Sequence, residues 1–227
     1  MIFNKTNFDH QEFKITDVFS PFGPLMMKGQ LKEDTKNKLD KSVKALLDED
    51  DNSDKVVHGD YGAMQDSALK SGKFKIIGIE NIEIIDVVHK LCNEWFSCSC
   101  LNLSENLGNQ IIENFKNSNV VLTSMWAVSM KSGDFHVSHN HVFEGAMLSG
   151  GIYLDVPEYL KSPEGDINWS MPVPGVEFRS DVYKHSPKSG DWFIWPSWLQ
   201  HHVYPFRGNG ERIMMSFNAR LEAKQNV

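Results

Sequence analysis

The sequence predicts a mainly β protein of the sandwich or jelly-roll type, preceded by a mixed α/β segment. From about residue 119 onward, apolar residues alternate with a period of two, which is typical of strands. Turn sequences (SPEG, PVPG, SPKSG and RGNG) then separate short apolar runs. The 227 residues are 41% hydrophobic and 11% aromatic, which excludes a disordered chain, a collagen and a coiled coil.

The first part of the chain, residues 1–118, is expected to support the same domain rather than form a separate one. Residues 12–30 are predicted to form one or two short strands, interrupted by two prolines and a glycine. Residues 31–48 have leucine and valine at helical spacing and predict an amphipathic helix. The acidic run 48–54 predicts a solvated loop. A second helix is expected over 79–96, with one face made of Ile79, Ile82, Ile85, Val88 or His89, Cys92 and Trp95.

The second part, residues 119–227, is expected to be the β core. Residues 119–130 are apolar on both alternating faces, which predicts a strand buried on both sides. Seven further strands are expected, at 135–142, 146–156, 166–171, 176–181, 191–195, 199–205 and 211–220.

Charge, cysteine content and hydropathy limit the partners and the compartment. The net charge of −7 argues against nucleic acid as a partner. No apolar run approaches the roughly 18 residues that span a bilayer, and the polar first residues do not resemble a signal peptide, so no membrane association is expected. Three clustered cysteines, Cys92, Cys98 and Cys100, do not form a disulfide framework and indicate a cytoplasmic protein.

Histidine is concentrated in the predicted core, where six of the nine histidines lie from His136 onward. Alternation on a strand would point His139 and His141 the same way and His136 the other way. Adjacent His201 and His202 would point to opposite faces, so one of them could complete a three-histidine site. Three protein ligands leave open coordination positions, as a catalytic metal requires.

A buried arginine is expected beside this site. Arg212 follows His201 by eleven residues, across the RGNG turn, where a jelly roll returns a strand beside its neighbour. A guanidinium in an apolar interior requires an anion, and it binds a carboxylate through two parallel hydrogen bonds. The spacing therefore predicts a cavity that holds a small dicarboxylate between a metal ion and Arg212.

These motifs resemble the 2-oxoglutarate- and Fe(II)-dependent dioxygenases, whose core is a double-stranded β-helix. The sequence is most similar to a poorly characterised branch from marine bacteria and phages with the pattern HxH, SGVYYL, FPSWLxHxVxP and ERISxxFN. The corresponding blocks here are His139-Asn140-His141, SGGIYL, WPSWLQHHVYP and ERIMMSFN. The resemblance covers roughly residues 119–220 and implies Fe(II), 2-oxoglutarate and O₂ as cofactor and co-substrates.

The resemblance implies that His139, His141 and His201 are the catalytic metal ligands and that Arg212 binds the far carboxylate of 2-oxoglutarate. It also suggests four further co-substrate contacts, Tyr153, Ser149, Ser216 and Asn218. The superfamily has a carboxylate where this chain has His141, so the triad could instead include an acidic residue. His202 stays an alternative to His201 as the distal ligand. Candidates for the apolar walls are Trp126, Phe135, Phe193 and Trp195.

The implied activity is hydroxylation of a substrate coupled to decarboxylation of 2-oxoglutarate. Two other interpretations stay open: a cupin-like three-histidine metalloenzyme that does not use 2-oxoglutarate, and a non-enzymatic jelly-roll binding module. The sequence does not distinguish a small molecule from a peptide side chain as the primary substrate, nor a monomer from a homodimer.

Overall fold

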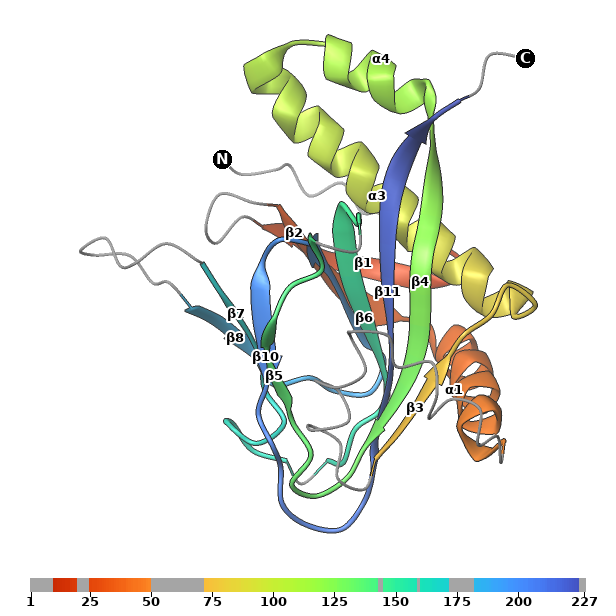
Figure 1. Ribbon diagram of the computed structural model, residues 1–227, viewed down its shortest axis with the longest axis vertical. Helices are drawn as coiled ribbons and strands as arrows, with labels where there is room; N and C mark the ends of the chain where they lie inside the picture. Colours follow the sequence, from red (N-terminus) through yellow and green to blue (C-terminus); the bar gives the residue numbers. More distant parts are fainter. Residues whose placement is uncertain are drawn as a thin grey trace.

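The fold consists of two facing β-sheets, with helices packed on the outer side of the larger sheet (Figure 1). The computed structural model describes residues 10–19, 25–49, 72–142, 145–158, 160–171 and 182–224. Within these residues the chain is mainly β, as predicted, and it has the antiparallel arrangement of a double-stranded β-helix. The predicted strand 176–181 and most of the acidic run 48–54 lie outside the described residues.

The larger sheet has seven strands in the order β1-β2-β9-β6-β11-β4-β3, all paired antiparallel. Its strands are β1 (Phe13–Phe19), β2 (Met26–Leu31), β3 (Lys73–Ile76), β4 (Ser118–Met130), β6 (Leu148–Asp155), β9 (Asp191–Pro196) and β11 (Arg212–Ala223). The first 118 residues thus supply three strands of this sheet, because β1 and β2 extend one edge and β3 extends the other.

The smaller sheet has four antiparallel strands in the order β5-β10-β7-β8. Its strands are β5 (His136–His139), β7 (Ile167–Ser170), β8 (Val182–His185) and β10 (Gln200–Val203). β5 is shorter than the predicted strand 135–142, because regular pairing with β10 ends at His139.

Two apolar clusters lie on opposite faces of the larger sheet, as the alternation along β4 predicts. On β4, Met125 and Ala127 belong to the outer cluster, whereas Trp126, Val128 and Met130 face the space between the sheets. The same alternation on β11 sends Ile213, Met215, Phe217 and Ala219 outward and Met214 inward. The even-numbered residues of both strands therefore line the interior where a site can form.

In the described part of the chain, three helices cover the outer face: α1 (Glu33–Asp48), α3 (Ile82–Leu107) and α4 (Gln110–Lys116). α1 buries Leu39, Val43 and Leu47 on one face, at the helical spacing that the sequence predicts. α3 begins later and ends later than the predicted helix 79–96, and Ile82 at its start is 72% exposed. The buried face of α3 therefore begins at Ile84 rather than at Ile79.

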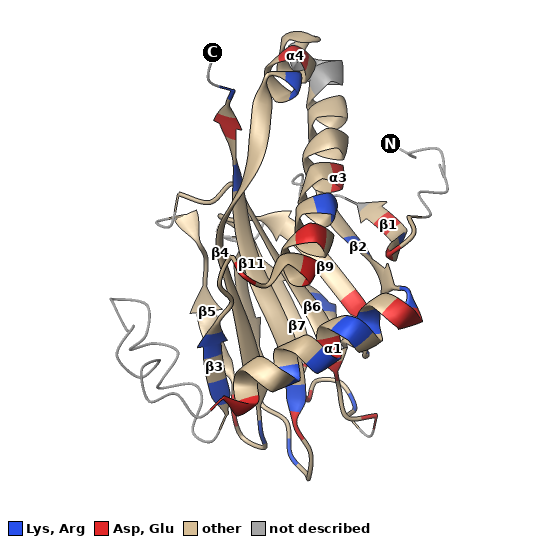
Figure 2. Cartoon of the chain, turned by 90° about the vertical axis from the view of Figure 1, so that its right-hand side faces the viewer, with Lys and Arg blue, Asp and Glu red and all other residues tan. Residues whose placement is uncertain are grey.

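The outer surface of α1 carries alternating charges rather than one uniform patch (Figure 2). Lys44 lies 2.9 Å from Asp40 on its own helix and 2.9 Å from Asp155 at the end of β6. These two carboxylates neutralise Lys44 locally. Among the described residues, no helix is long and apolar enough to cross a membrane.

Candidate active site

The position of the first histidines depends on an irregularity in β5. His139 pairs with His201, and His136 pairs with Val203, so three residues of β5 span the same length as two residues of β10. The extra residue shifts the alternation by one. As a result His136 lines the same cavity as His139, and the expectation that His136 points to the other face is wrong.

His139, His141 and His201 lie together between the two sheets. Their nearest ring nitrogens are all within 4.8 Å of one another, and no other group of three or more potential ligands occurs in the part of the chain that the structure describes. The ring centroids are separated by 4.3 Å for His139–His201, 5.1 Å for His139–His141 and 5.3 Å for His141–His201. The exposed side of β10 carries His202, which is outside this group.

Backbone contacts orient two of the three imidazoles. The Nδ1 atom of His139 lies 2.7 Å from the carbonyl oxygen of Val137, and the Nδ1 of His201 lies 3.1 Å from that of Leu199. A carbonyl oxygen only accepts, so each Nδ1 carries the hydrogen and each Nε2 keeps its lone pair. This tautomer is the one that binds a metal ion through Nε2.

His141 lies beyond the end of β5 and is held by other contacts. Its backbone N–H donates to the carbonyl oxygen of Ser197 at 2.9 Å, which ties it to the turn before β10. Its Nδ1 lies 3.5 Å from the side-chain amide of Asn218 on β11. That amide also bonds to Ser149 at 2.7 Å and to Ser124 at 3.0 Å. A buried polar network from three strands of the larger sheet therefore supports this histidine.

The three histidines open into a cavity of about 30 Å³ between the sheets. Its polar lining consists of the three histidines, His136, Ser149, Ser216 and Asn218, and its apolar lining includes Trp126, Trp195 and Met214. No Asp, Glu, Lys or Arg side chain of the described residues lines it. The volume corresponds to about two water molecules.

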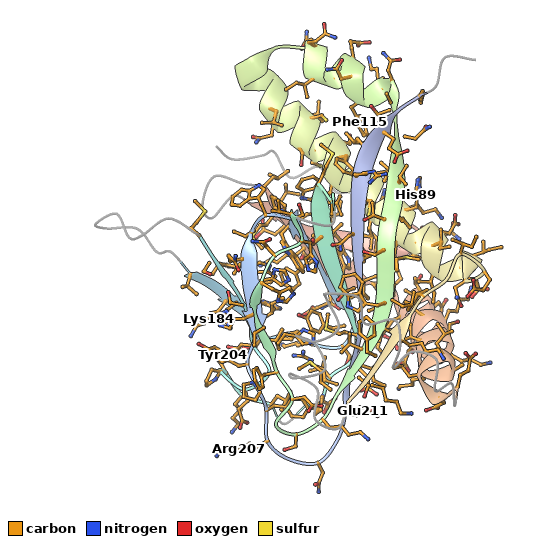
Figure 3. The ribbon with its side chains drawn as sticks, viewed as in Figure 1. His89, Phe115, Lys184, Tyr204, Arg207 and Glu211 are labelled. Atoms are coloured by element: carbon orange, nitrogen blue, oxygen red, sulfur yellow. The ribbon has the colours of Figure 1, made fainter. Side chains whose placement is uncertain are left out.

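Arg212 begins β11 and is fully buried, whereas Arg207 in the preceding turn points outward (Figure 3). Its guanidinium donates to the carbonyl oxygen of Gly165 at 2.8 Å, contacts the sulfur of Met130 at 2.6 Å and lies 5.7 Å from the ring centre of Tyr153. No carboxylate of the described residues pairs with it. Its Nε has no hydrogen-bond partner there, and neither has the buried hydroxyl of Tyr153.

Burial controls the charges in this region. Desolvation, with the neighbouring His139 and His141, holds the pKa of His201 well below its ordinary value, so its imidazole is neutral and available to a metal ion. Burial also lowers the pKa of Arg212 and raises the pKa of Tyr153 to about 12. Arg212 is not among the residues that line the cavity described above. A buried guanidinium without a carboxylate is costly, so the space beside Arg212 is suited to an anion.

Most residues singled out in the sequence lie at this site. The cavity lining contains Ser149, Ser216 and Asn218, and Trp126 and Trp195 form part of its walls. Tyr153 lies beside Arg212 rather than in the lining, and Phe193 belongs to the inner apolar cluster. Two acidic residues flank the HxH motif and could have replaced a histidine of the triad. The carboxylate of Asp134 accepts a hydrogen bond from the backbone N–H of Lys131 in the turn before β5, and Glu144 lies outside the described residues.

Sequence reasoning missed three neighbours of the site. His136 was assigned to the opposite face, because a bulge leaves no signal in a run of alternating residues. Met130 and Gly165 contact Arg212 from segments that are distant in the sequence. Only the pairing of β11 with β4 brings Met130 opposite Arg212.

Comparison with known families supports the same interpretation. Residues 124–218 match the model of a family described as "Putative 2OG-Fe(II) oxygenase". The matched segment begins on β4 and ends at Asn218, so it contains all three histidines and Arg212. No curated protein is similar enough in sequence to count as a match.

Several solved structures share the fold at low sequence identity. A prolyl-4-hydroxylase from Pseudomonas putida is 14% identical, with a TM-score of 0.55 over 86% of this chain and 92% of that one. The non-heme alpha-ketoglutarate-dependent epimerase SnoN from nogalamycin biosynthesis is 12% identical, with a TM-score of 0.59 over 86% and 77%. A prolyl hydroxylase from Trichoplax adhaerens is 15% identical, with a TM-score of 0.54 over 89% and 82%. At these identities the likeness concerns the fold.

The matched segment contains the three clustered histidines, which could hold a metal ion, and the fold is that of the structures named above. Three imidazoles suit Fe(II) and leave coordination positions open for other ligands. The family match, the fold and the three-histidine cluster together support a 2-oxoglutarate- and Fe(II)-dependent dioxygenase.

Proposed function

We propose that this protein hydroxylates an organic substrate, with Fe(II) held by His139, His141 and His201 and with 2-oxoglutarate held between the iron and Arg212. The observation that carries the proposal is the convergence of three imidazoles within 4.8 Å beside a buried arginine that lacks a carboxylate among the described residues. Bound iron would supply oxygen activation, so that 2-oxoglutarate, O₂ and substrate become succinate, CO₂ and the hydroxylated product. The protein's own residues bind and orient these reactants.

The donor set fits a divalent iron ion. His139 and His201 have their Nδ1 atoms occupied by backbone carbonyls, which favours metal binding through Nε2. His141 replaces the carboxylate that the superfamily uses, so the three ligands are all neutral. The site would then keep the full positive charge of the ion, which strengthens its attraction for an anionic co-substrate.

The amide of Asn218 is proposed to set the orientation of His141. If Nε2 of His141 binds iron, its Nδ1 carries the hydrogen and requires an acceptor. Amide oxygen and nitrogen are assigned from such networks, and exchanging them satisfies every partner. The oxygen of Asn218 would then accept from His141 and Ser124, and its nitrogen would donate to Ser149.

Arg212 is proposed to bind the far carboxylate of 2-oxoglutarate. It shares one face of β11 with Met214, Ser216 and Asn218, so this strand runs from the anion end of the site to the metal end. The free Nε of Arg212 and the unpartnered hydroxyl of Tyr153 are both buried hydrogen-bond donors. A carboxylate between them would remove the cost of leaving both unsatisfied.

Met214 lies between the cavity and Arg212. Its sulfur is 4.0 Å from the guanidinium, while its side chain also lines the cavity. A co-substrate that reaches from the triad to Arg212 would pass this side chain, so we expect Met214 to shift when 2-oxoglutarate binds. Methionine has three rotatable bonds and adapts to such a change at low cost.

The substrate is proposed to be a small molecule or a peptide side chain. Both classes occur among the similar structures, because one prolyl hydroxylase is in complex with a hypoxia inducible factor peptide and SnoN is in complex with nogalamycin RO. The motif pattern supports assignment to the marine bacterial and phage branch named above. The free cysteines support a reducing, cytoplasmic location.

The test is release of succinate from 2-oxoglutarate by the purified protein with Fe(II) in air. We expect turnover in the wild type and none in His139→Ala or His201→Ala, with His202→Ala as a matched control that keeps it. Metal-dependent activity that persists in Arg212→Ala without 2-oxoglutarate would instead favour a three-histidine enzyme of the cupin-like kind. Absence of both metal retention and 2-oxoglutarate binding in the wild type would favour a non-enzymatic module.

A further inference from the structure

A fourth histidine faces the cavity and has no role in the proposal above. His136 lines the cavity together with His139, His141 and His201. Its Nε2 is buried and has no hydrogen-bond partner among the residues that the structure describes. A buried, unsatisfied ring nitrogen in a cavity wall is costly unless a ligand or water completes it.

His136 is poorly placed to be a metal ligand. Its ring centre is 6.2 Å from that of His139, farther than any centroid separation within the triad. It is also outside the group whose nitrogens all lie within 4.8 Å of one another. His136 therefore faces the space beside the metal position rather than the metal position itself.

The chain path brings His136 toward the arginine end of the site. Arg212 pairs with Met130 at the end of β4, and a short turn, closed by the Asp134 N–H to Lys131 carbonyl hydrogen bond, leads into β5. His136 is the first residue of β5, whereas His139 is the last. Burial lowers the pKa of the His136 imidazole to about 3, with smaller contributions from His139 and from the positive charge of Arg212.

The chemistry of the cavity wall favours an anionic occupant at this position. Outside the triad, the hydroxyl of Ser216 and the ring of His136 can donate hydrogen bonds to an occupant, and no carboxylate of the described residues lines the cavity. An anion that lies between the triad and Arg212 would pass beside His136. In the tautomer that carries its hydrogen on Nε2, His136 can donate this hydrogen to a carboxylate oxygen.

We propose that His136 is a co-substrate-binding residue, whose Nε2 donates a hydrogen bond to the carboxylate of 2-oxoglutarate that faces Arg212. The inference rests on the proposed function, because it requires 2-oxoglutarate to bind in this cavity. His136 is a neutral donor on the smaller sheet, and Arg212 is a charged donor on the larger sheet. Both would bind the same carboxylate. The register irregularity in β5 turns His136 toward the cavity, so this irregularity would serve co-substrate binding.

The experiment measures 2-oxoglutarate binding by calorimetry to protein loaded with Co(II) in place of iron, so that no turnover occurs. His136→Phe removes both ring nitrogens, His136→Gln restores a donor near the Nε2 position, and His136→Asn places one nearer Nδ1. A hydrogen bond to a charged group is worth roughly 10- to 150-fold in affinity. We expect Kd to rise by about that factor in His136→Phe and His136→Asn, and to stay within a few-fold of the wild type in His136→Gln.

His202→Phe is the matched control, because it makes the same change on the side of β10 away from the triad. Its Kd should equal that of the wild type. Co(II) affinity and the Co(II) absorption spectrum, measured without 2-oxoglutarate, should not change in any His136 variant. If His136→Phe does not fold, the contrast between His136→Asn and His136→Gln makes the same test.

Three results would overturn the proposal while leaving the proposed function intact: equal 2-oxoglutarate affinity in all His136 variants, equal weakening in His136→Gln and His136→Asn, or loss of Co(II) rather than of 2-oxoglutarate. Equal affinity in all variants would mean that His136 does not contact 2-oxoglutarate. Equal weakening in His136→Gln and His136→Asn would mean that His136 only packs against its neighbours. Loss of Co(II) would mean that His136 acts at the metal. If the Co(II)-loaded wild type does not bind 2-oxoglutarate, the proposed function fails, and this inference fails with it.

Discussion

Arg212 is expected to contribute little to the stability of the fold and much to the binding of 2-oxoglutarate. Its side chain is fully buried, and its guanidinium contacts one carbonyl oxygen, one sulfur and one aromatic ring, but no carboxylate among the described residues. Arg212→Met removes the charge and keeps a long, flexible apolar side chain in its place. We expect this variant to fold with a stability close to that of the wild type and to lose 2-oxoglutarate binding.

The magnitude follows from two opposing contributions to the free energy of unfolding. Loss of the hydrogen bond to the Gly165 carbonyl oxygen leaves a buried acceptor unsatisfied, at about 1–3 kcal/mol. Removal of a buried charge in favour of apolar packing is often neutral or stabilising, by about 1–4 kcal/mol. The net change expected for Arg212→Met without 2-oxoglutarate therefore lies between about 2 kcal/mol against the variant and about 3 kcal/mol in its favour.

Binding of 2-oxoglutarate should stabilise the wild type more than Arg212→Met. At a ligand concentration of 100 Kd, the wild type gains about 2.7 kcal/mol of stability. Loss of a charge-assisted contact weakens binding by roughly 10- to 150-fold. At that same concentration the variant would gain less than about 1.5 kcal/mol.

Urea denaturation of the Co(II)-loaded proteins, with and without 2-oxoglutarate, measures both quantities. Arg220→Met is the matched control, because Arg220 lies on the same strand and forms a surface ion pair with Glu222. That variant should lose less than about 1 kcal/mol and keep the full gain from 2-oxoglutarate. A loss of more than 2 kcal/mol in ligand-free Arg212→Met would show that the guanidinium serves the fold, and an undiminished gain from 2-oxoglutarate would refute its role in binding.

Three further outcomes are expected. Asn218→Ala should weaken Co(II) binding by about 10- to 100-fold in calorimetry, because it removes the contact that orients its histidine partner. The metal-free protein should become less stable toward urea as the pH falls below 6.5. The reason is that His201 takes up a proton in the unfolded chain, whereas its buried imidazole in the folded protein does not. In His201→Gln this pH dependence should be weaker. Gly150→Ala should cost about 1–3 kcal/mol in urea denaturation, because its Cβ would collide with the ring of Phe217, whereas Gly151→Ala meets only a flexible methionine end and should cost less.

The elements with strong periodic patterns were predicted best. β4 and β11 are long and alternate cleanly, and the structure confirms that β4 buries both faces. The start of α3 was predicted too early, because Ile79 and Ile82 fit the helical spacing but lie on the surface. Periodicity records which residues share a face, but it does not record whether another element covers that face.

The histidines of β5 show the same limit within the site. Strict alternation placed His136 away from His139, but one extra residue opposite β10 brings both into the cavity. A bulge is created by the pairing of two strands and is invisible in either strand alone. The choice between His201 and His202 is of the same kind, since adjacent residues differ only in the face that the sheet turns inward.

By itself, the sequence determined the β-rich class of the core, the residue types available for a metal ion and the presence of an arginine that follows them. These depend on local pattern and on chemistry that each side chain carries with it. Only the tertiary structure decided which three imidazoles meet within 4.8 Å, that His136 joins their cavity, and that Arg212 is buried without a carboxylate among the described residues. These are properties of pairing between strands that are distant in the sequence, where register, bulges and burial fix the distances.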